Sequence, residues 1–419
     1  MTEDRDVLRA ISWRDVFPWV LIFRTFGISF QLRILLLAIA GVILVDLGWW
    51  GASQVFLSPE ERPRSNVIHP PIVASRSVEK AAEGSLGTIL MLADPIQEVW
   101  VHATRPYRTF FSVHNSVRTT AYRAFCALWA TAVWSIFGGA ICRIAALALT
   151  RDERCGLKAA LKFGLSRFLS FFTAPLFPML GVLAFAIPSM LLGLLAYFGE
   201  AGLLISGVLY FIAAIFGVMT AALLIPLLFG WPLMWGAIST EASDAFDALS
   251  RSYAYVTQRP LNFAFYSAIS LAVGALGLFV ASVVVIVSLG MTDWAFAIGA
   301  GEERLAEIQV AVEDSPIFRY SSPGVGIPVS GPELTQGAKI IHFWRGLVVR
   351  IIDGYVYGFF FISATAVYLL LRYDVDQAEL DEVTLEDEVR FPPPSFGSEE
   401  GEKSEEPGNI ETTPPPPRD

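Results

Sequence analysis

Residues 261–292 read LNFAFYSAISLAVGALGLFVASVVVIVSLGMT and contain no charged side chain. A helix rises about 1.5 Å per residue, so this stretch is long enough to cross the roughly 30 Å of hydrocarbon in a bilayer. Similar charge-free stretches cover residues 124–142, 168–199 and 201–240. Apolar runs of this length are typical of transmembrane helices and not of soluble cores. We therefore expect an integral membrane protein with an all-α fold.

The composition agrees, since 54% of the residues are hydrophobic and 17% are charged. Soluble domains have roughly 45–50% and about 25%. The pattern predicts a polytopic bundle over residues 34–372, with six spans at 34–57, 124–145, 168–198, 203–228, 262–290 and 351–372. Prolines at 175, 178 and 188 in the third span, and at 226 and 232 after the fourth, predict bends or short breaks there.

Residues 1–33 are interpreted as a cytoplasmic N-terminus with an interfacial helix. Trp13, Phe17 and Leu21 recur at helical spacing within a segment that also holds charged residues. An alternative makes residues 16–30 a short span, but Arg24 would then lie near mid-membrane at a cost of about 2.5–3.5 kcal/mol.

The orientation follows from the basic residues of the short loops. Residues 143–167 carry six Lys and Arg side chains, whereas the turn near Glu200 carries none. The positive-inside rule places the basic loop, and hence both termini, in the cytoplasm of a multi-pass inner (plasma) membrane protein. Two long segments, 58–122 and 291–350, then lie outside.

The net charge of −10 belongs to the C-terminal tail, residues 373–419. From Asp374 onward there are fifteen acidic and three basic residues, together with many Pro, Ser and Thr. Such a composition cannot bury a core, so we expect a disordered acidic, proline-rich cytoplasmic tail. The chain shows no basic cluster of the kind that binds nucleic acid, and we expect no nucleic-acid partner.

Two cytoplasmic connectors, residues 150–163 and 241–256, have the pattern of surface helices. In the second, Ser243 or Asp244 is a candidate N-cap residue. Its apolar face is predicted from four residues at helical spacing: Phe246, Leu249, Tyr253 and Val256. A weak internal duplication and convergent amphipathic loops both explain the two connectors.

The second connector also carries a resemblance. The sequence DAFDALSRSY at residues 244–253, followed by Arg259-Pro260, resembles bacterial polytopic membrane proteins of unknown function. It is distantly similar to the membrane domain attached to some glycerophosphodiester phosphodiesterases. The resemblance covers about residues 120–290 and implies a helical membrane domain. No catalytic residue carries over, because the soluble phosphodiesterase barrel is absent and the long outer segments depart from the pattern.

Asp46 is the one acidic residue well inside a predicted span. An intramembrane carboxylate is a candidate proton or cation site. The competing interpretation, which we favour from the sequence, places Asp46 at the outer end of its span, solvated and next to an interfacial pair, Trp49 and Trp50.

The last span begins with candidate polar and packing residues. Arg350 and Asp353 are three positions apart and can pair on one helical face. Gly354 and Gly358 form a GxxxG pattern, which allows another helix to approach closely. Tyr355 and Tyr357 are expected in the interfacial aromatic belt.

Catalytic and cofactor signatures such as GxSxG, HExxH or a phosphate loop are absent from the sequence. The four histidines match no metal-site spacing. We therefore expect no enzyme activity, no cofactor and no metal, and hypothesise a non-enzymatic scaffold, accessory or envelope-maintenance component. Its expected partners are the lipid bilayer and membrane proteins or a second copy of the chain. The alternatives are a small-solute transporter or channel and, third, an intramembrane enzyme.

Overall fold

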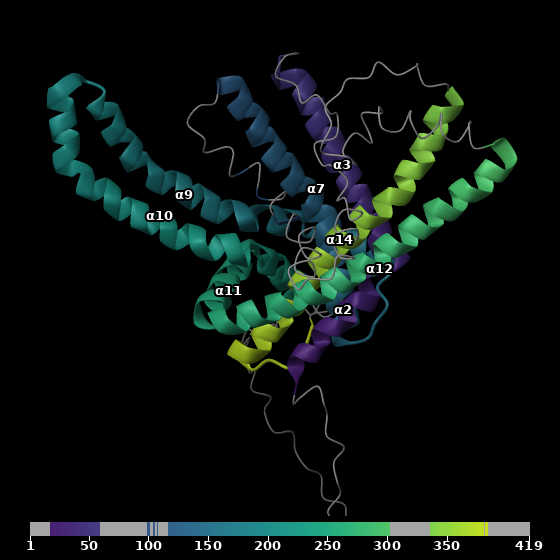
Figure 1. Cartoon of the computed structure of the whole chain (residues 1–419). Helices are drawn as coiled ribbons and strands as arrows, with labels where there is room; N and C mark the ends of the chain where they lie inside the picture. The colour runs from purple at the N-terminus through teal and green to yellow at the C-terminus, as the bar shows by residue number, and fades with distance from the viewer. Residues whose placement is uncertain are drawn as a thin grey trace, which may run out of the picture. The chain divides into compact units, whose positions relative to one another are not determined.

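The structure is a computed structural model, and it describes residues 17–58, 99–100, 104, 107, 116–301, 336–380 and 382–383 (Figure 1). The chain divides into two units, Met1–Val383 and Thr384–Asp419, and the second lies outside these residues. Within the described part of the first unit every regular element is a helix and none is a strand. The all-α fold expected from the sequence is confirmed.

Ten helices follow one another along the described residues. They are η1 (Pro18–Val20), α2 (Leu21–Ser29), α3 (Leu32–Phe56), α7 (Val117–Thr150), α8 (Leu157–Ser166), α9 (Phe168–Ala196), α10 (Gly199–Glu241), α11 (Ala245–Gln258), α12 (Pro260–Ala300) and α14 (Gln336–Asp376).

Six of these helices are long and apolar enough to cross a membrane: α3, α7, α9, α10, α12 and α14. They coincide with the six predicted spans, so the chain is a multi-pass helix bundle. Several extend beyond the predicted bounds, since α10 runs on to Glu241 and α12 to Ala300. Hydropathy locates the apolar part of a helix, whereas the hydrogen-bonded backbone continues into the polar residues beside it.

The prolines do not interrupt the helices. Pro175, Pro178 and Pro188 lie inside α9, and Pro226 and Pro232 lie inside α10. The predicted short breaks are therefore wrong. A proline removes one backbone hydrogen bond, which a long helix packed against neighbours tolerates with a bend.

The core of the bundle is built around α14. This helix packs against α3, α7, α10, α12 and α2. In its most apolar stretch 89% of the residues are buried, compared with 78% in α7 and 6% in α9. Aromatic rings fill the contact between α14 and α7, where Trp134 stacks on Tyr357 at a centroid distance of 4.9 Å. The last long helix of the described chain is thus the central one.

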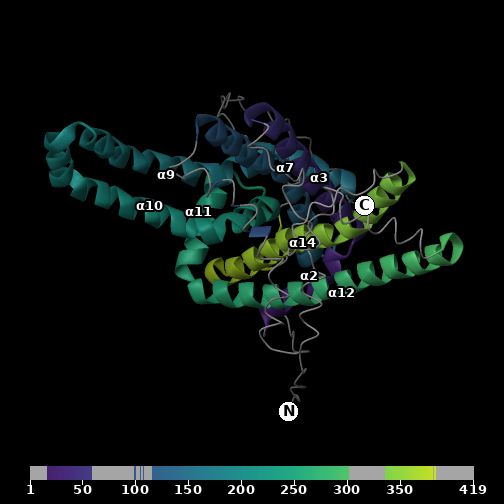
Figure 2. The ribbon, with the colours of Figure 1, turned by 45° about the horizontal axis from the view of Figure 1, so that its top comes forward.

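Helices α9 and α10 form a hairpin that we call the α9–α10 arm. Figures 1 and 2 both show it projecting away from α3, α7 and α14. The two helices pack on each other along the arm, and α9 also contacts α7 and α11. The C-terminal part of α10, from Leu227 to Thr240, belongs to the bundle, where it packs against α11, α14 and α7. Large apolar side chains such as Leu204 (73% exposed) and Tyr197 (85% exposed) cover its surface.

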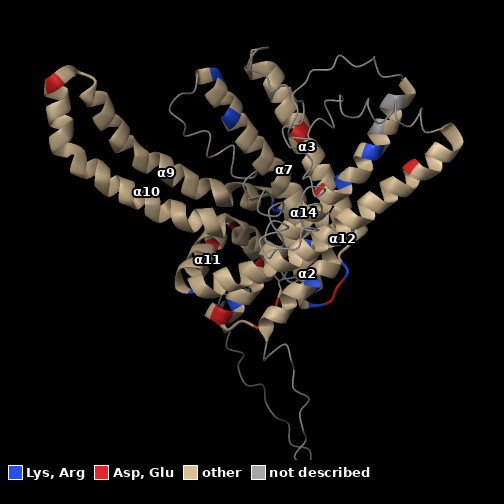
Figure 3. Ribbon diagram, viewed as in Figure 1, with Lys and Arg blue, Asp and Glu red and all other residues tan. Residues whose placement is uncertain are grey.

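The other ends of the helices meet at what we call the α8–α11 end, where α8, α11 and α2 gather. Figure 3 shows charged residues around α2 and α11, in contrast to the long uncharged stretches of α9 and α10. The start of α3 lies here, since Arg33 donates to the carbonyl of Cys155. The chain after α14 returns to the same end, because Arg151 donates to the carbonyl of Val383 at 3.0 Å.

Helix α2 is nine residues long, about 13 Å, and is too short to cross a bilayer on its own. Its Arg24 donates to the carbonyls of Ala148 and Leu149 and pairs with Asp152. The guanidinium therefore caps the C-terminus of α7, a favourable place for a cation. Because Arg24 has these partners, the free-energy cost of an uncompensated arginine no longer argues against the alternative in which residues 16–30 enter the membrane. The interfacial position of α2 itself stays a prediction.

Both connectors contain a helix, but the first was predicted to be helical from residue 150, whereas residues 151–156 are not helical and α8 begins at Leu157; α11 begins at Ala245. Asp244 is the N-cap of α11, because its carboxylate accepts the Asp247 amide at 2.8 Å. The predicted apolar face of α11 is only partly correct. Its most buried residues are Ala248, Ser252 and Tyr255, while Phe246 is 65% exposed. Gly230 on α10 lets α11 approach closely at Ser252 and Val256.

Candidate functional site

An ion cluster joins the middle of α3 to α14. Asp46 on α3 and Asp353 on α14 both contact Arg350, which lies between them. The Nη1 atom of Arg350 donates to Asp353 Oδ2 at 2.8 Å, and its Nη2 atom donates to Asp46 Oδ2 at 3.3 Å. The spacing of three residues predicted the first contact. The second joins residues 304 positions apart, which no local pattern can pair.

The cluster lies inside the helix bundle. The side chains of Asp46, Arg350 and Asp353 are 14%, 18% and 3% exposed, respectively. Asp46 Oδ1 is fully covered and has no hydrogen-bond partner. The expectation that Asp46 is solvated is therefore wrong. An unpaired oxygen in such a place is costly and is a reason to look for a ligand.

The tryptophan pair beside Asp46 misled the sequence interpretation. Trp49 is 4% exposed and donates its indole N–H to the carbonyl of Cys126 on α7 at 2.9 Å. Trp50 is 45% exposed. One ring therefore belongs to the α3–α7 contact, and the pair does not mark a water-facing end of the helix. Two adjacent residues of a helix point in different directions, so a shared role was never required.

The glycines bring α14 onto α3 beside the cluster. A Cβ atom at Gly354 would lie 2.8 Å from Ile39 Cγ1, and one at Gly358 would lie 2.7 Å from Ile34 Cγ2. Both distances are too short for real side chains. The structure thus brings all five candidate residues, Asp46, Arg350, Asp353, Gly354 and Gly358, to a single helix contact.

The tyrosines of α14 are core residues and not members of an interfacial belt. Tyr355 is 0% exposed, and its hydroxyl donates to the carbonyl of Gly274 at 3.2 Å. Tyr357 is 4% exposed and stacks on Trp134. The expectation failed because α14 is surrounded by other helices, so its aromatic residues fill the bundle and do not anchor at an edge.

A second ion pair joins α14 to α12. Arg345 pairs with Asp293 on α12, and both side chains are about four-fifths buried, being 21% and 19% exposed. Sequence reasoning missed this pair because both residues fell within the predicted outer segment 291–350. The helices α12 and α14 extend into that segment and carry the two charges along with them.

The α8–α11 end holds a larger polar network, also missed from the sequence. Glu241, the last residue of α10, pairs with Arg251 on α11 and with Arg372 on α14, and accepts the Tyr368 hydroxyl at 2.7 Å. Asp374 accepts from Asn262 at 2.7 Å and from Tyr266 at 2.9 Å. These contacts tie four helices together and leave no obvious opening for a substrate.

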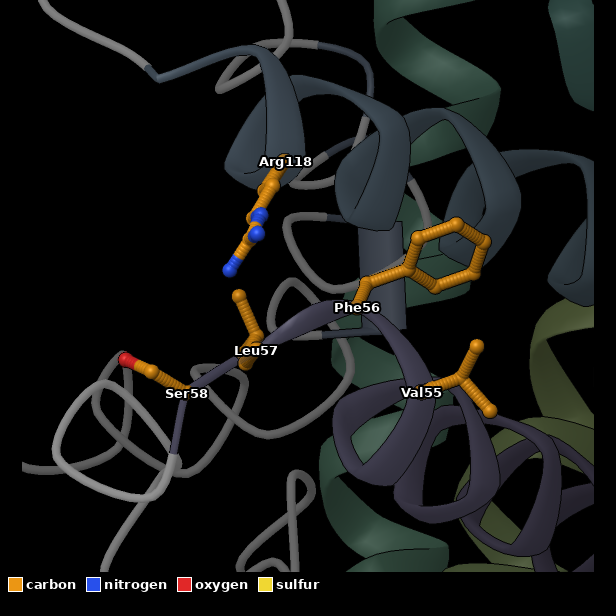
Figure 4. Close-up of a pocket in the computed structure, with 5 residues that line it drawn as sticks. All are labelled: Val55, Phe56, Leu57, Ser58 and Arg118. Atoms are coloured by element: carbon orange, nitrogen blue, oxygen red, sulfur yellow. The ribbon is translucent and has the colours of Figure 1, made fainter.

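The described residues show neither a metal-binding group nor a pocket with an evident chemical role. Among the described residues no group of His, Cys, Asp and Glu is arranged to hold a metal ion. The side chains of all four histidines lie outside that part of the structure, so the question of a zinc site does too. A pocket among the described residues opens at the end of α3 and is lined by Val55, Phe56, Leu57, Ser58 and Arg118 (Figure 4).

Comparison with family models, with curated proteins and with solved structures finds no match for this chain. The resemblance to the membrane domain of glycerophosphodiester phosphodiesterases therefore stays an expectation. The case for function rests on the ion cluster and the α9–α10 arm.

Proposed function

We propose that the chain is a non-enzymatic scaffold or accessory component of the bacterial inner membrane, acting in envelope maintenance or in a membrane-protein assembly. Both termini and the α8–α11 end lie in the cytoplasm in this proposal, in keeping with the six basic residues of segment 143–167. Its partners are the lipid bilayer and other membrane proteins, or a second copy of the chain.

The α9–α10 arm is the observation that carries the proposal. Beyond its contacts with the bundle the arm offers long apolar faces of both helices, and on α10 the exposed large apolar side chains lie between Leu203 and Phe229. In the most apolar stretch of α10 none of the residues is buried. Lipid alone can cover such a surface, but an arm held away from its own bundle also offers a long face to another transmembrane helix. A compact transporter would bury these helices around its path.

Transport or conduction of a small solute is the second candidate, and Asp46 is the observation that favours it. A covered, unpaired carboxylate oxygen at mid-helix is the arrangement expected of a proton or ion site. Against this candidate, the described spans around the arm contain few polar side chains beyond Ser and Thr to line a path.

The substitution Asp46→Asn separates the two functions. It removes the ionisable carboxyl group of Asp46, keeps the shape of the side chain and leaves Arg350 paired with Asp353. A scaffold should keep full function, because its helix contacts are unchanged. A proton- or ion-coupled transporter should lose its activity. The measurement is growth and envelope integrity of a strain that depends on the protein, with the abundance of the variant in the membrane determined in parallel.

We expect normal growth. Loss of function at normal abundance would contradict the scaffold proposal and favour transport. Asp293→Asn is the matched control, since it also removes one buried carboxylate from a pair with an arginine of α14 but leaves Asp46 unchanged.

A further inference from the structure

We propose that the cluster of Asp46, Arg350 and Asp353 is a proton-binding site, with the proton carried on the carboxyl group of Asp46. The proposal states that a proton is bound at this site and does not depend on what the whole protein does. It holds for a scaffold and for a transporter alike, so it can fail or succeed independently of the proposed function.

The charges of the cluster do not balance. Two carboxylates face one guanidinium, so the fully ionised cluster has a net charge of −1. The charged groups that act on Asp46 are Arg350 and Asp353. Arg345, five residues before Arg350 on α14, is itself engaged in an ion pair with Asp293.

Among the described residues, the electrostatic partners of Asp46 are Arg350 and Asp353, and the other groups that face this part of α3 are neutral. Facing this part of α3 from α7 are Trp129, which donates to the carbonyl of Leu44, and Cys126, whose carbonyl accepts from Trp49. On α14 the neighbouring titratable group is the phenol of Tyr357. On α2, Arg24 is engaged with the C-terminus of α7 at the α8–α11 end.

The position along α3 makes an uncompensated charge expensive. Asp46 is about 21 Å from the first residue of α3 and about 15 Å from the last, at 1.5 Å per residue. A helix of this length therefore holds the carboxylate near the middle of the hydrocarbon. There a lone negative charge is strongly disfavoured, and a carboxyl group responds by taking up a proton.

Geometry assigns the proton to Asp46. Asp353 Oδ2 is 2.8 Å from the guanidinium, whereas Asp46 Oδ2 is 3.3 Å from it. The closer, more buried carboxylate gains more from ionisation beside Arg350. Asp46 also has an oxygen atom available to take up the proton, because no hydrogen-bond donor reaches its Oδ1. The other oxygen, Oδ2, keeps its contact with Arg350 whether or not Oδ1 is protonated.

A proton fits this site better than a metal ion. Sodium, magnesium and calcium need several oxygen ligands, and each would meet the positive charge of Arg350 beside the same carboxyl group. A proton needs a single oxygen. Binding transfers one proton from water to Oδ1, forms one O–H bond and brings the net charge of the cluster from −1 to zero; release reverses each change.

The test is infrared spectroscopy of the full chain purified in lipid nanodiscs at neutral pH. A protonated carboxylic acid has a C=O stretching band well above the carboxylate bands. We expect this band in the unmodified protein, its shift when aspartate is isotope-labelled, and its loss in Asp46→Asn. Isotope labelling needs no variant, so the proposal can be tested even if a substitution prevents folding.

Two control variants sharpen the result. Asp293→Asn should keep the band, since it leaves the cluster unchanged. Asp353→Asn should lose it, because Asp46 then pairs alone with Arg350 and ionises. The proposal is overturned by the absence of an isotope-sensitive band in the unmodified protein, by a band that survives Asp46→Asn, or by a band that disappears in Asp293→Asn.

Discussion

Glu241 is the side chain on which three helices depend at the α8–α11 end. It is 12% exposed and pairs with Arg251 and Arg372 while accepting the Tyr368 hydroxyl. Glu241→Gln keeps the shape but removes the charge that both arginines share. We expect a loss of about 1–3 kcal/mol in the free energy of unfolding, because charge-assisted hydrogen bonds and a partly buried guanidinium are left poorly paired. Unfolding in mixed micelles measures it.

Asp247→Asn is the matched control for that substitution. Asp247 pairs with the same Arg251, but as an exposed contact between residues four positions apart on one helix. Such pairs contribute about 0.3–0.5 kcal/mol. Equal losses in the two variants would show that Glu241 does not hold the helices together.

The candidate site could be predicted in part from the sequence. The spacing of Arg350, Asp353, Gly354 and Gly358 on one helix predicts one pair and one packing face, since both depend on local geometry. The contact of Arg350 with Asp46 does not follow from spacing, because it depends on which of six spans become neighbours. Glu241 was missed for the same reason: its partners lie on other helices.

The contact between α3 and α14 depends on two positions that accept no side chain. Replacing Gly354 and Gly358 together by Ala places Cβ atoms within 2.8 Å of Ile39 and 2.7 Å of Ile34. We expect α14 to shift away from α3 and the protein to lose about 1–3 kcal/mol per site, the usual cost of overpacking. Thermal unfolding in detergent, followed by tryptophan fluorescence, measures the loss.

Gly337→Ala provides the control on the same helix, since a Cβ atom there meets nothing within 4 Å. Alanine favours a helix by up to about 1 kcal/mol relative to glycine. The control should therefore be neutral or slightly stabilising. If the double variant were as stable as Gly337→Ala, close approach of α3 and α14 would not matter for stability.

The number of spans was correctly predicted because each apolar run exceeds the length needed to cross a bilayer. Continuity through Pro226 and Pro232 was not predicted, since sequence shows the lost hydrogen bond but not the neighbours that compensate for it. The sequence also could not predict that the α9–α10 arm projects from the bundle. A lipid-facing helix and a helix in the bundle core have similar hydropathy, so composition does not separate α9 from α14.

The proposed orientation of the bundle can be tested at two exposed positions at opposite ends. Glu200 lies at the turn of the α9–α10 arm, and Lys158 lies on α8. In a Cys155→Ser background, Glu200→Cys should react with a membrane-impermeant thiol reagent in intact cells. Lys158→Cys should react only after permeabilisation. The reverse labelling pattern would overturn the orientation; Cys126 and Cys142 are buried and provide little background.

The boundary between the bundle and its acidic tail is set by contacts after α14. Arg372 donates to the Glu382 carbonyl at 2.7 Å, and Val383 is 2% exposed. A chain truncated after Val383 should keep its full thermal stability in detergent. A chain truncated after Glu379 should be less stable, because Arg151 and Arg372 lose these partners. Equal stability of the two would show that the returning segment contributes nothing.

The central helix of the bundle, α14, is also the last of the described helices to be synthesised. Asp46 leaves the ribosome 304 residues before Arg350, an interval of about 15–60 s at roughly 5–20 residues per second. During that time five helices occupy the membrane without the neighbour that joins them. We expect this five-helix stage to be an open array that closes only when α14 is added, because α14 makes contacts with α3, α7, α10 and α12.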